Sequence, residues 1–280
     1  MHIEGFEYRD VRVAEDVTLH TAIAGSGPAF VLLHGFPQTH LMWRHVAPAL
    51  AQSHTVICPD LRGYGASSKP ADGYDKRTMA QDIVDLAAAL GHDRFALAGH
   101  DRGAHVAFRA GLDHPDRVTH LAILDVLPTP EMWDVLRGVD AAVAFHLYLM
   151  AQPPGLPEQL IAGAPDAFFG SFLDAWGTTP LHDDVRAAYL DASRNAIPSI
   201  VADYRATATI DLEHDRADRA AGRTFQMPVS VVQQDWGFPA AELWQPWAPG
   251  LTHQTVTCGH FMAEAAPELI TDVLRTLRRN

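Results

Sequence analysis

The stretch Phe95-Ala96-Leu97-Ala98-Gly99-His100-Asp101-Arg102-Gly103 decides the fold. Its first four residues form a continuous apolar run, which is typical of a strand buried on both faces of a sheet. Two glycines flank Asp101 at the point where a helical pattern begins. Glycines are needed there because the turn is tight and the helix packs close to the strand. The stretch therefore predicts a strand, a sharp turn with Asp101 at its apex, and a helix over residues 102–112.

The same alternation of strand and helix extends along most of the chain. Apolar runs predict strands at residues 29–33, 55–58, 118–124, 229–232 and 254–257, after a hairpin within residues 11–22. Apolar periodicity predicts further helices at residues 41–51, 76–90 and 263–278. This order indicates an α/β fold with a mostly parallel sheet and helices on both faces.

The rhythm changes near Pro128-Thr129-Pro130, where helical stretches broken by Pro and Gly replace the buried strands. We therefore expect a helical cap inserted after the strand that ends at Asp125. The predicted domains are a first part of the core at residues 1–127, the cap at residues 128–222 and a second part of the core at residues 223–280.

Composition favours an enzyme with a large core. The 280 residues are 48% hydrophobic and 20% charged, as in ordinary globular proteins. Lys and Arg number 21 against 34 Asp and Glu, so the net charge is −13, and nucleic acid or a membrane surface is not an expected partner. No apolar run approaches the ~18 residues of a membrane span. Two cysteines make no disulfide framework, so a reducing compartment fits. The N-terminus lacks the pattern of a signal peptide. We expect a cytoplasmic protein that binds a small-molecule substrate.

Three residues at strand ends form a candidate catalytic triad. Asp101 stands where a nucleophilic Ser stands in a G-x-S-x-G turn, Asp125 ends the following strand, and His260 follows the last strand. Asp235, in the loop after residues 229–232, is a competing acid and ranks second because Asp125 sits directly at its strand end. The alternative interpretation is that Asp101 and Asp125 cap turns and that His260 is an ordinary loop residue.

The loop His34-Gly35-Phe36-Pro37 also follows a buried strand. Such a loop can supply a backbone N–H to an oxyanion hole, together with the residue after the nucleophile. We predict that the N–H groups of Phe36 and Arg102 form this pair. The alternative is an ordinary strand-ending turn.

These motifs resemble the α/β-hydrolases that use an Asp nucleophile, among them haloalkane dehalogenases and epoxide hydrolases. The likeness is carried by His34-Gly-Phe-Pro-Gln-Thr-His40, Asp60-Leu-Arg-Gly-Tyr-Gly65, Gly99-His-Asp-Arg-Gly103 and Leu124-Asp-Val-Leu-Pro128. It is strongest with fluoroacetate (haloacetate) dehalogenases, and it continues through Ala151-Gln-Pro-Pro-Gly-Leu-Pro157, Asp203-Tyr-Arg205 and Ile210-Asp-Leu-Glu-His-Asp215. The resemblance thus covers nearly the whole chain and implies the α/β-hydrolase fold.

The resemblance implies a two-step reaction. Asp101 attacks a saturated carbon, displaces a halide or opens an epoxide, and becomes an alkyl ester. Water activated by His260 hydrolyses the ester, while Asp125 holds the His260 tautomer. A homodimer is implied by the resemblance alone.

Two positions depart from the fluoroacetate dehalogenase pattern. The two Arg residues that hold a substrate carboxylate there correspond to Arg102 and His105, and the His, Trp and Tyr that receive fluoride correspond to His146, Leu147 and Tyr204. A neutral histidine cannot give a permanently charged grip, and leucine gives fluoride no donor. His146 and Tyr204 could instead protonate an epoxide oxygen.

The main hypothesis is hydrolytic dehalogenation of short 2-haloacids, and the alternative is an epoxide hydrolase with the same triad. A third hypothesis is a non-catalytic binding protein on the same scaffold. None of the sixteen histidines makes a credible metal pair, so we expect no metal and no cofactor. We interpret five tryptophans as core or pocket wall: Trp43, Trp176, Trp236, Trp244 and Trp247.

Overall fold

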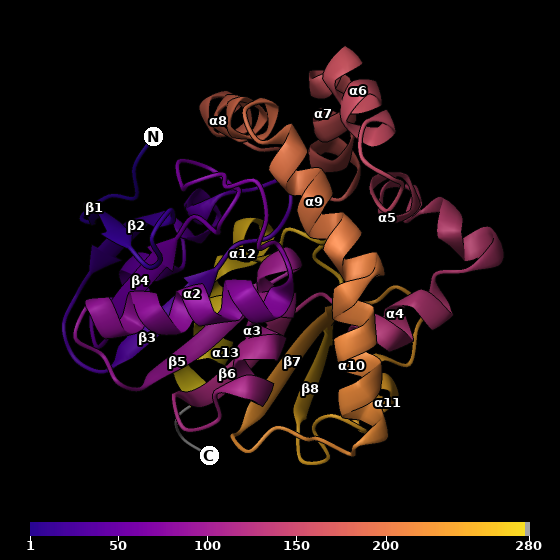
Figure 1. The fold of residues 1–280 in the computed structure, drawn as a ribbon. Helices are drawn as coiled ribbons and strands as arrows, with labels where there is room; N and C mark the ends of the chain where they lie inside the picture. Colours follow the sequence, from indigo (N-terminus) through magenta and orange to yellow (C-terminus); the bar gives the residue numbers. More distant parts are fainter. Residues whose placement is uncertain (278–280) are drawn as a thin grey trace.

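A computed structural model describes residues 1–277, apart from the side chain of Asp140. An eight-stranded sheet in the order β1-β2-β4-β3-β5-β6-β7-β8 crosses the molecule (Figure 1). Its strands are β1 (Glu7–Arg12), β2 (Thr18–Ala24), β3 (Ala29–Leu33), β4 (Thr55–Pro59), β5 (Phe95–His100), β6 (Val118–Leu124), β7 (Val229–Gln234) and β8 (Thr252–Val256). The pairs β1–β2 and β2–β4 are antiparallel and the remaining pairs are parallel. The predicted mostly parallel sheet is confirmed.

Helices cover the two faces of this sheet. In Figure 1, α2 (Lys76–Ala89) and α3 (Arg102–Asp113) lie in front of it, and α12 (Met262–Ala265) and α13 (Pro267–Thr276) lie behind. The helix α11 (Ala240–Trp244) follows β7. Both β3 and β5 are buried along their whole length, as expected of central strands between two helical layers.

Two predicted helices are each divided by a proline. The predicted helix at 41–51 is a 3-10 helix η1 (His40–Trp43) followed by a short α1 (Ala47–Leu50). Pro48 has no N–H to donate to the preceding turn, so the helix restarts with this proline in its first turn. Pro267 likewise separates α12 from α13. The predicted end of this last helix at residue 278, and of the second core part at residue 280, lie outside the described residues.

The segment between β6 and β7 is helical. It contains α4 (Thr129–Val135), η2 (Gly138–Ala142), α5 (Phe145–Met150), α6 (Leu156–Gly163), α7 (Pro165–Ala175), α8 (Asp183–Arg194), α9 (Ile197–Ala208) and α10 (Ile210–Ala220). Four of these helices carry a proline in the first turn, where its missing N–H costs no bond. The domain boundaries at 127/128 and 222/223 stay predictions.

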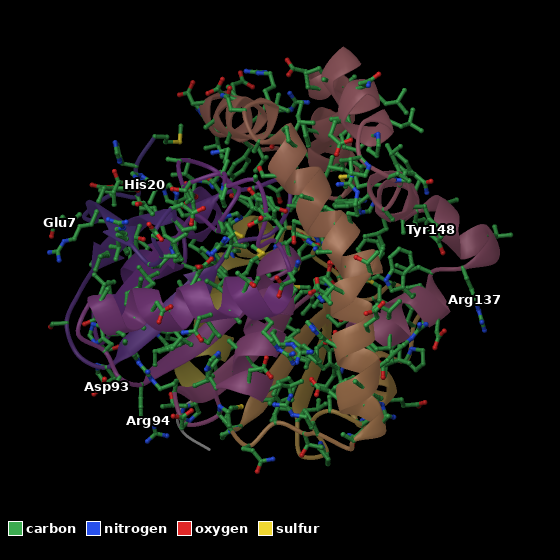
Figure 2. All side chains as sticks on the ribbon, in the orientation of Figure 1. Glu7, His20, Asp93, Arg94, Arg137 and Tyr148 are labelled. Atoms are coloured by element: carbon green, nitrogen blue, oxygen red, sulfur yellow. The ribbon has the colours of Figure 1, made fainter. Side chains whose placement is uncertain are left out.

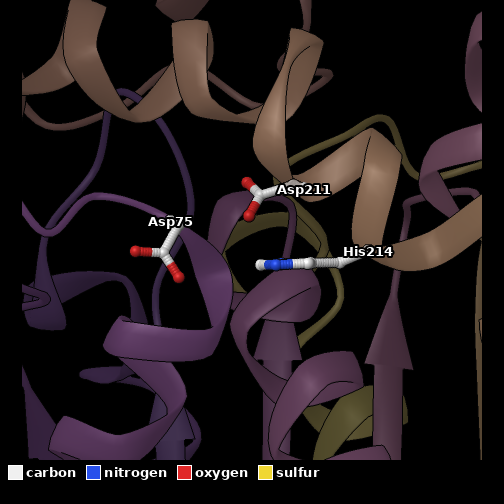
Figure 3. Close-up of side chains that lie close together, drawn as sticks. All are labelled: Asp75, Asp211 and His214. Carbon is white, nitrogen blue, oxygen red and sulfur yellow. The ribbon is translucent and has the colours of Figure 1, made fainter. Parts of the chain in front are cut away.

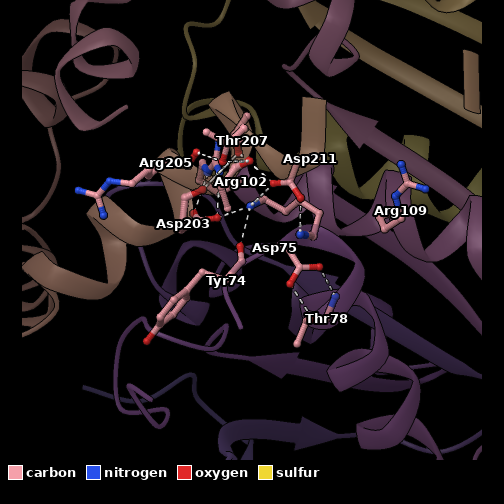
Figure 4. Close-up of polar contacts among 12 residues, drawn as sticks. Tyr74, Asp75, Thr78, Arg102, Arg109, Asp203, Arg205, Thr207 and Asp211 are labelled. Carbon is pink, nitrogen blue, oxygen red and sulfur yellow. Dashed lines mark hydrogen bonds and ion pairs between the residues drawn. The ribbon is translucent and has the colours of Figure 1, made fainter. Parts of the chain in front are cut away.

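Buried ion pairs fasten α9 and α10 to α2 and α3 (Figure 4). The Asp203 carboxylate of α9 accepts hydrogen bonds from Arg102 of α3 and from Lys76 of α2. Arg109 of α3 pairs with Asp215 of α10. All five side chains are buried, and their charges are compensated within the protein, as buried charges require.

Other charged side chains lie at the surface of the molecule. Figure 2 shows Glu7, Arg94 and Arg137 at the outside of the molecule, and all three are exposed. In the part of the chain that the structure describes, no helix combines the length and the apolar character needed to cross a lipid bilayer.

Candidate active site

Asp101 stands at the apex of the turn between β5 and α3. Its φ is 48°, a left-handed conformation that costs a non-glycine residue about 1–3 kcal/mol. A Cβ atom on Gly99 or Gly103 would come closer than 3.0 Å to backbone atoms of Gly103 or His34. The two glycines therefore permit the close approach of strand and helix that projects the Asp101 side chain from the end of the sheet.

The Asp101 carboxylate is held at one oxygen and is free of hydrogen bonds at the other among the described residues. The Phe36 N–H donates to Oδ1 at 2.7 Å, and His260 Nε2 lies 3.9 Å from Oδ2. Burial alone would raise the pKa of Asp101, but nearby positive charge, first at His260, and the Phe36 N–H lower it below its ordinary value. The group is therefore an ionised carboxylate with one oxygen free of hydrogen bonds among the described residues. The Arg102 N–H starts the helix beside it, and its share in an oxyanion hole stays a prediction.

His260 is paired with Asp125. Its Nδ1 lies 2.6 Å from Asp125 Oδ2. Asp235, the competing acid, instead accepts the N–H of Gly237 at 3.1 Å and shapes a turn. Burial alone would lower the pKa of His260, but the hydrogen bond to Asp125 and the charges of Asp125 and Asp101 outweigh it, so this pKa lies above the ordinary histidine value. The arrangement suits a base that takes up a proton at Nε2.

Two contacts at this pair were not foreseen from the sequence. The backbone N–H of His260 donates to the carbonyl oxygen of Trp176, at the end of α7. The helical segment between β6 and β7 therefore contacts the backbone of the histidine. Trp236 Nε1 donates to Asp125 Oδ1 at 3.1 Å. Both tryptophans were expected only in the core or the pocket wall, and their positions after α7 and β7 are the only signal of these contacts in the sequence.

These side chains line a cavity of about 540 Å³. The triad residues lie on its wall, and so do all five predicted substrate-binding residues: Arg102, His105, His146, Leu147 and Tyr204. Much of the remaining wall is apolar and comes from the segment after β6, including Met132, Leu136 and Val143. A mostly apolar cavity with a few converging polar groups is typical of a small-molecule site.

His146 and Tyr204 lie on the cavity wall in edge-to-face contact, and each has a polar atom without a hydrogen-bond partner among the described residues. Their ring centroids are 5.6 Å apart, and His146 Nδ1 and the Tyr204 hydroxyl are buried with no hydrogen bond among the described residues. Burial lowers the pKa of His146 to about 3. Burial and the charge of Asp101 raise the pKa of Tyr204 well above its ordinary value. The pair is therefore neutral, and the phenol keeps its proton.

Arg102 lines the cavity, but its charge is already compensated. Nε donates to Asp203 Oδ2 at 2.8 Å, and Nη2 donates to Asp203 Oδ1 at 2.9 Å and to Thr207. The guanidinium also lies 4.2 Å from the centre of the Tyr204 ring. Burial lowers the pKa of His105 to about 3, with the charge of Arg102 as the next cause. The predicted grip of Arg102 on a substrate carboxylate stays a prediction, with Nη1 as the nitrogen that makes no hydrogen bond among the described residues.

One group of potential metal ligands lies outside the cavity. Oxygen or nitrogen atoms of Asp75, Asp211 and His214 come within 4.8 Å of one another (Figure 3). Both carboxylates already accept hydrogen bonds from the backbone. Asp75 accepts the N–H of Thr78 at the start of α2, and Asp211 accepts the N–H of Lys76.

Comparison with known proteins identifies the family. The model of the alpha/beta hydrolase fold matches residues 28–150. A fluoroacetate dehalogenase of Burkholderia sp is 40% identical over 97% of this chain and 93% of its own length. A soluble epoxide hydrolase of Corynebacterium sp. (strain C12) is 33% identical over 91% of each chain.

A solved structure agrees with these sequence matches. A candidate α/β-hydrolase from Nostoc sp PCC 7120 superposes with a TM-score of 0.94 at 38% identity, over 99% of both chains. The predicted fold and the resemblance are thus confirmed. The protein is an enzyme of the α/β-hydrolase family, on the branch that contains fluoroacetate dehalogenases and epoxide hydrolases.

Proposed function

We propose that this hydrolase uses Asp101 as a nucleophile on a saturated carbon and passes through a covalent alkyl ester. The observation that carries the proposal is the setting of the partly exposed Asp101 carboxylate between a backbone N–H on Oδ1 and the imidazole of His260 near Oδ2. Asp101 also occupies the position of the nucleophile in the turn. A serine there would form an ether, which this machinery could not hydrolyse.

In the first step, Oδ2 attacks the carbon that bears the leaving group. The new C–O bond forms as the bond to the leaving group breaks, and the bonding electrons depart with that group. In the second step, His260 Nε2 takes a proton from water and the resulting hydroxide adds to the ester carbonyl carbon. Negative charge then develops on Oδ1, where the Phe36 N–H stabilises it. The bond between the acyl carbon and the alkyl oxygen then breaks, the alcohol leaves with the proton held on His260 Nε2, and the Asp101 acid loses its proton to water and becomes a carboxylate again.

The proposed substrates are short 2-haloacids. The 40% sequence identity to a fluoroacetate dehalogenase supports this class. The net reaction replaces the halogen by a hydroxyl group and releases halide and a proton. Nη1 of Arg102, which makes no hydrogen bond among the described residues, is the group proposed to meet the substrate carboxylate.

Epoxides are a second candidate class, favoured by one observation. The Tyr204 hydroxyl and His146 Nδ1 are buried and neutral, and neither forms a hydrogen bond within the part of the chain that the structure describes. An epoxide needs a proton donor at its oxygen when the ring opens, and a phenol that keeps its proton supplies one. This candidate uses the same attack by Asp101 and the same ester hydrolysis.

One experiment tests the covalent step. Purified protein in excess over substrate is allowed a single turnover in water enriched in oxygen-18. We expect the first product molecule to carry ordinary oxygen from Asp101, and the label to appear in the Asp101 peptide by mass spectrometry. Labelled product in the first turnover, or turnover by an Asp101→Ala variant, would refute the nucleophile.

A substrate panel decides between the two classes. Chloroacetate, fluoroacetate, 1-haloalkanes and small epoxides are incubated separately, and free halide and diol are measured. Halide from the haloacids supports the first proposal. Diol without halide selects the epoxide hydrolase. No product from any of these compounds, with the protein folded, would support a non-catalytic role.

A further inference from the structure

Trp236 is a surface residue that donates a hydrogen bond to Asp125, the proposed acid of the triad. The residue is 45% exposed, yet it also lines the cavity. The indole Nε1–H points inward to Asp125, 3.1 Å from Oδ1 and 3.3 Å from Oδ2. A half-exposed indole has water available as a partner, so this bond to a buried carboxylate requires a loop of the right shape.

The loop after β7 provides that shape. The Asp235 N–H donates to the carbonyl oxygen of Val256 and continues the pairing with β8. The Asp235 carboxylate accepts the N–H of Gly237, whose φ is +76°. These bonds clamp the residues on both sides of Trp236 and turn its ring back over Asp125.

Asp125 receives donors on both oxygens. Gln233 Nε2 and the Gln234 N–H donate to Oδ1 at 3.0 and 2.7 Å, and the indole adds a third donor there. Oδ2 accepts from His260 at 2.6 Å and shares the indole N–H. Of these donors, the indole alone comes from a side chain at the surface and contacts both oxygens.

We propose that Trp236 is a positioning residue, whose indole N–H fixes the Asp125 carboxylate opposite His260 and takes up part of the negative charge that Asp125 presents to the imidazole. Its kinetic consequence rests on the proposed function. Its effect on His260 belongs to the resting enzyme and needs no substrate.

The expected effect follows from charge-assisted hydrogen bonding. An N–H that donates to a carboxylate lowers the charge left for other donors. When the indole N–H is removed, Asp125 binds the imidazolium more strongly, and the pKa of His260 rises further above its ordinary value. The other titratable groups that face His260 keep their places: Asp101 from the β5–α3 turn, His100 from β5 and His146 from α5.

The decisive variant is Trp236→Phe, which keeps a ring on the cavity wall and removes the donor. The His260 imidazole is titrated by NMR in the resting protein. We expect its pKa to rise by about 0.5 to 1 pH unit, as for one lost hydrogen bond among several. On an accepted substrate, the acid limb of ester hydrolysis should move upward by the same amount while KM changes little.

Two controls separate positioning from general disturbance. Phe238→Leu alters the same loop and the same cavity wall without touching a donor. Trp133→Phe removes an indole N–H that donates to the Thr207 carbonyl oxygen, away from Asp125. Neither should move the His260 titration. An equal shift in Phe238→Leu, or no shift in Trp236→Phe, overturns the proposal.

A measurement on the unmodified protein covers the case in which Trp236→Phe does not fold. The Trp236 indole N–H should exchange with deuterated water more slowly than that of a free indole, although the ring is half exposed. Exchange as fast as that of free indole would overturn the proposal. Because the NMR titration and the exchange measurement need no turnover, they remain interpretable even if Asp101 forms no ester.

Discussion

At the scale of single residues, Tyr204 offers the sharpest test of substrate class. Tyr204→Phe removes one hydroxyl and keeps the ring that covers the Arg102 guanidinium. Loss of a positioned proton donor costs about 10²-fold or more in rate, so diol formation from epoxides should fall by that amount, and chloride release from chloroacetate, which needs less hydrogen bonding than fluoride release, should fall much less. Tyr148→Phe is the control, because that hydroxyl donates to the Leu136 carbonyl oxygen at the surface. Diol formation unchanged in Tyr204→Phe would leave His146 as the donor.

His260 predicts the pH dependence of ester hydrolysis. Its pKa is raised, so the imidazolium persists to higher pH than for an ordinary histidine near 6.5. Only the neutral form accepts a proton from water, so the rate should rise with pH. Its midpoint should lie below the His260 pKa of the resting enzyme, because ester formation removes the Asp101 charge that helps to raise that pKa. Stopped-flow decay of the preformed ester measures this limb. A rate that does not change with pH, or a midpoint above the His260 pKa of the resting enzyme, would contradict His260 as the base.

The two candidate acids can be separated by matched substitutions. Asp125→Asn should slow ester hydrolysis by about 10³-fold or more, because the amide favours the wrong histidine tautomer. Asp235→Asn keeps a group that can accept the Gly237 N–H and should change the rate less than about tenfold. Accumulation of ester in the first variant, followed by intact-mass spectrometry, is the signature. The reverse ranking of the two variants would make Asp235 the acid.

At the scale of elements, the contact of α9 with α2 and α3 should dominate the effect of mutation on stability. Asp203 compensates both Lys76 and Arg102 in the interior. Removing one partner of a buried pair costs about 3–5 kcal/mol because the opposite charge stays buried alone. We expect Asp203→Asn to lower the free energy of unfolding by that amount in urea titrations.

Asp174→Asn is the matched control for this prediction. Asp174 of α7 pairs with Arg186 of α8 at 2.9 Å, and its side chain is 66% exposed. Exposed pairs contribute less than about 1 kcal/mol. Equal losses of stability in the two variants would show that burial of the ion pair is not what matters at Asp203.

The sequence predicted those elements whose pattern lies within a short stretch of the chain. The turn at Asp101 follows from an apolar run, two glycines and the start of a helix within nine residues. The division of the helix at 41–51 carried a local signal too, since Pro48 was visible, but a four-residue restart is below what periodicity can resolve.

At the scale of the whole molecule, contacts between distant segments were beyond sequence patterns. Arg102 and Asp203 are 101 residues apart, and Trp236 and Asp125 are 111 apart. Nothing in the periodicity of either segment specifies which side chain will meet which carboxylate. The compensation of Arg102 and the role of the loop after β7 therefore emerge only from the assembled fold. The homodimer implied by the resemblance stays a prediction.

The buried ion pairs between α9–α10 and α2–α3 have a consequence for protein engineering. Exchanging these two helices for those of another hydrolase would strand Lys76, Arg102 and Arg109 in a dry interior without counter-ions. A chimera of this enzyme must therefore inherit both halves of each ionic contact from one parent, or replace both halves together with apolar side chains of similar volume.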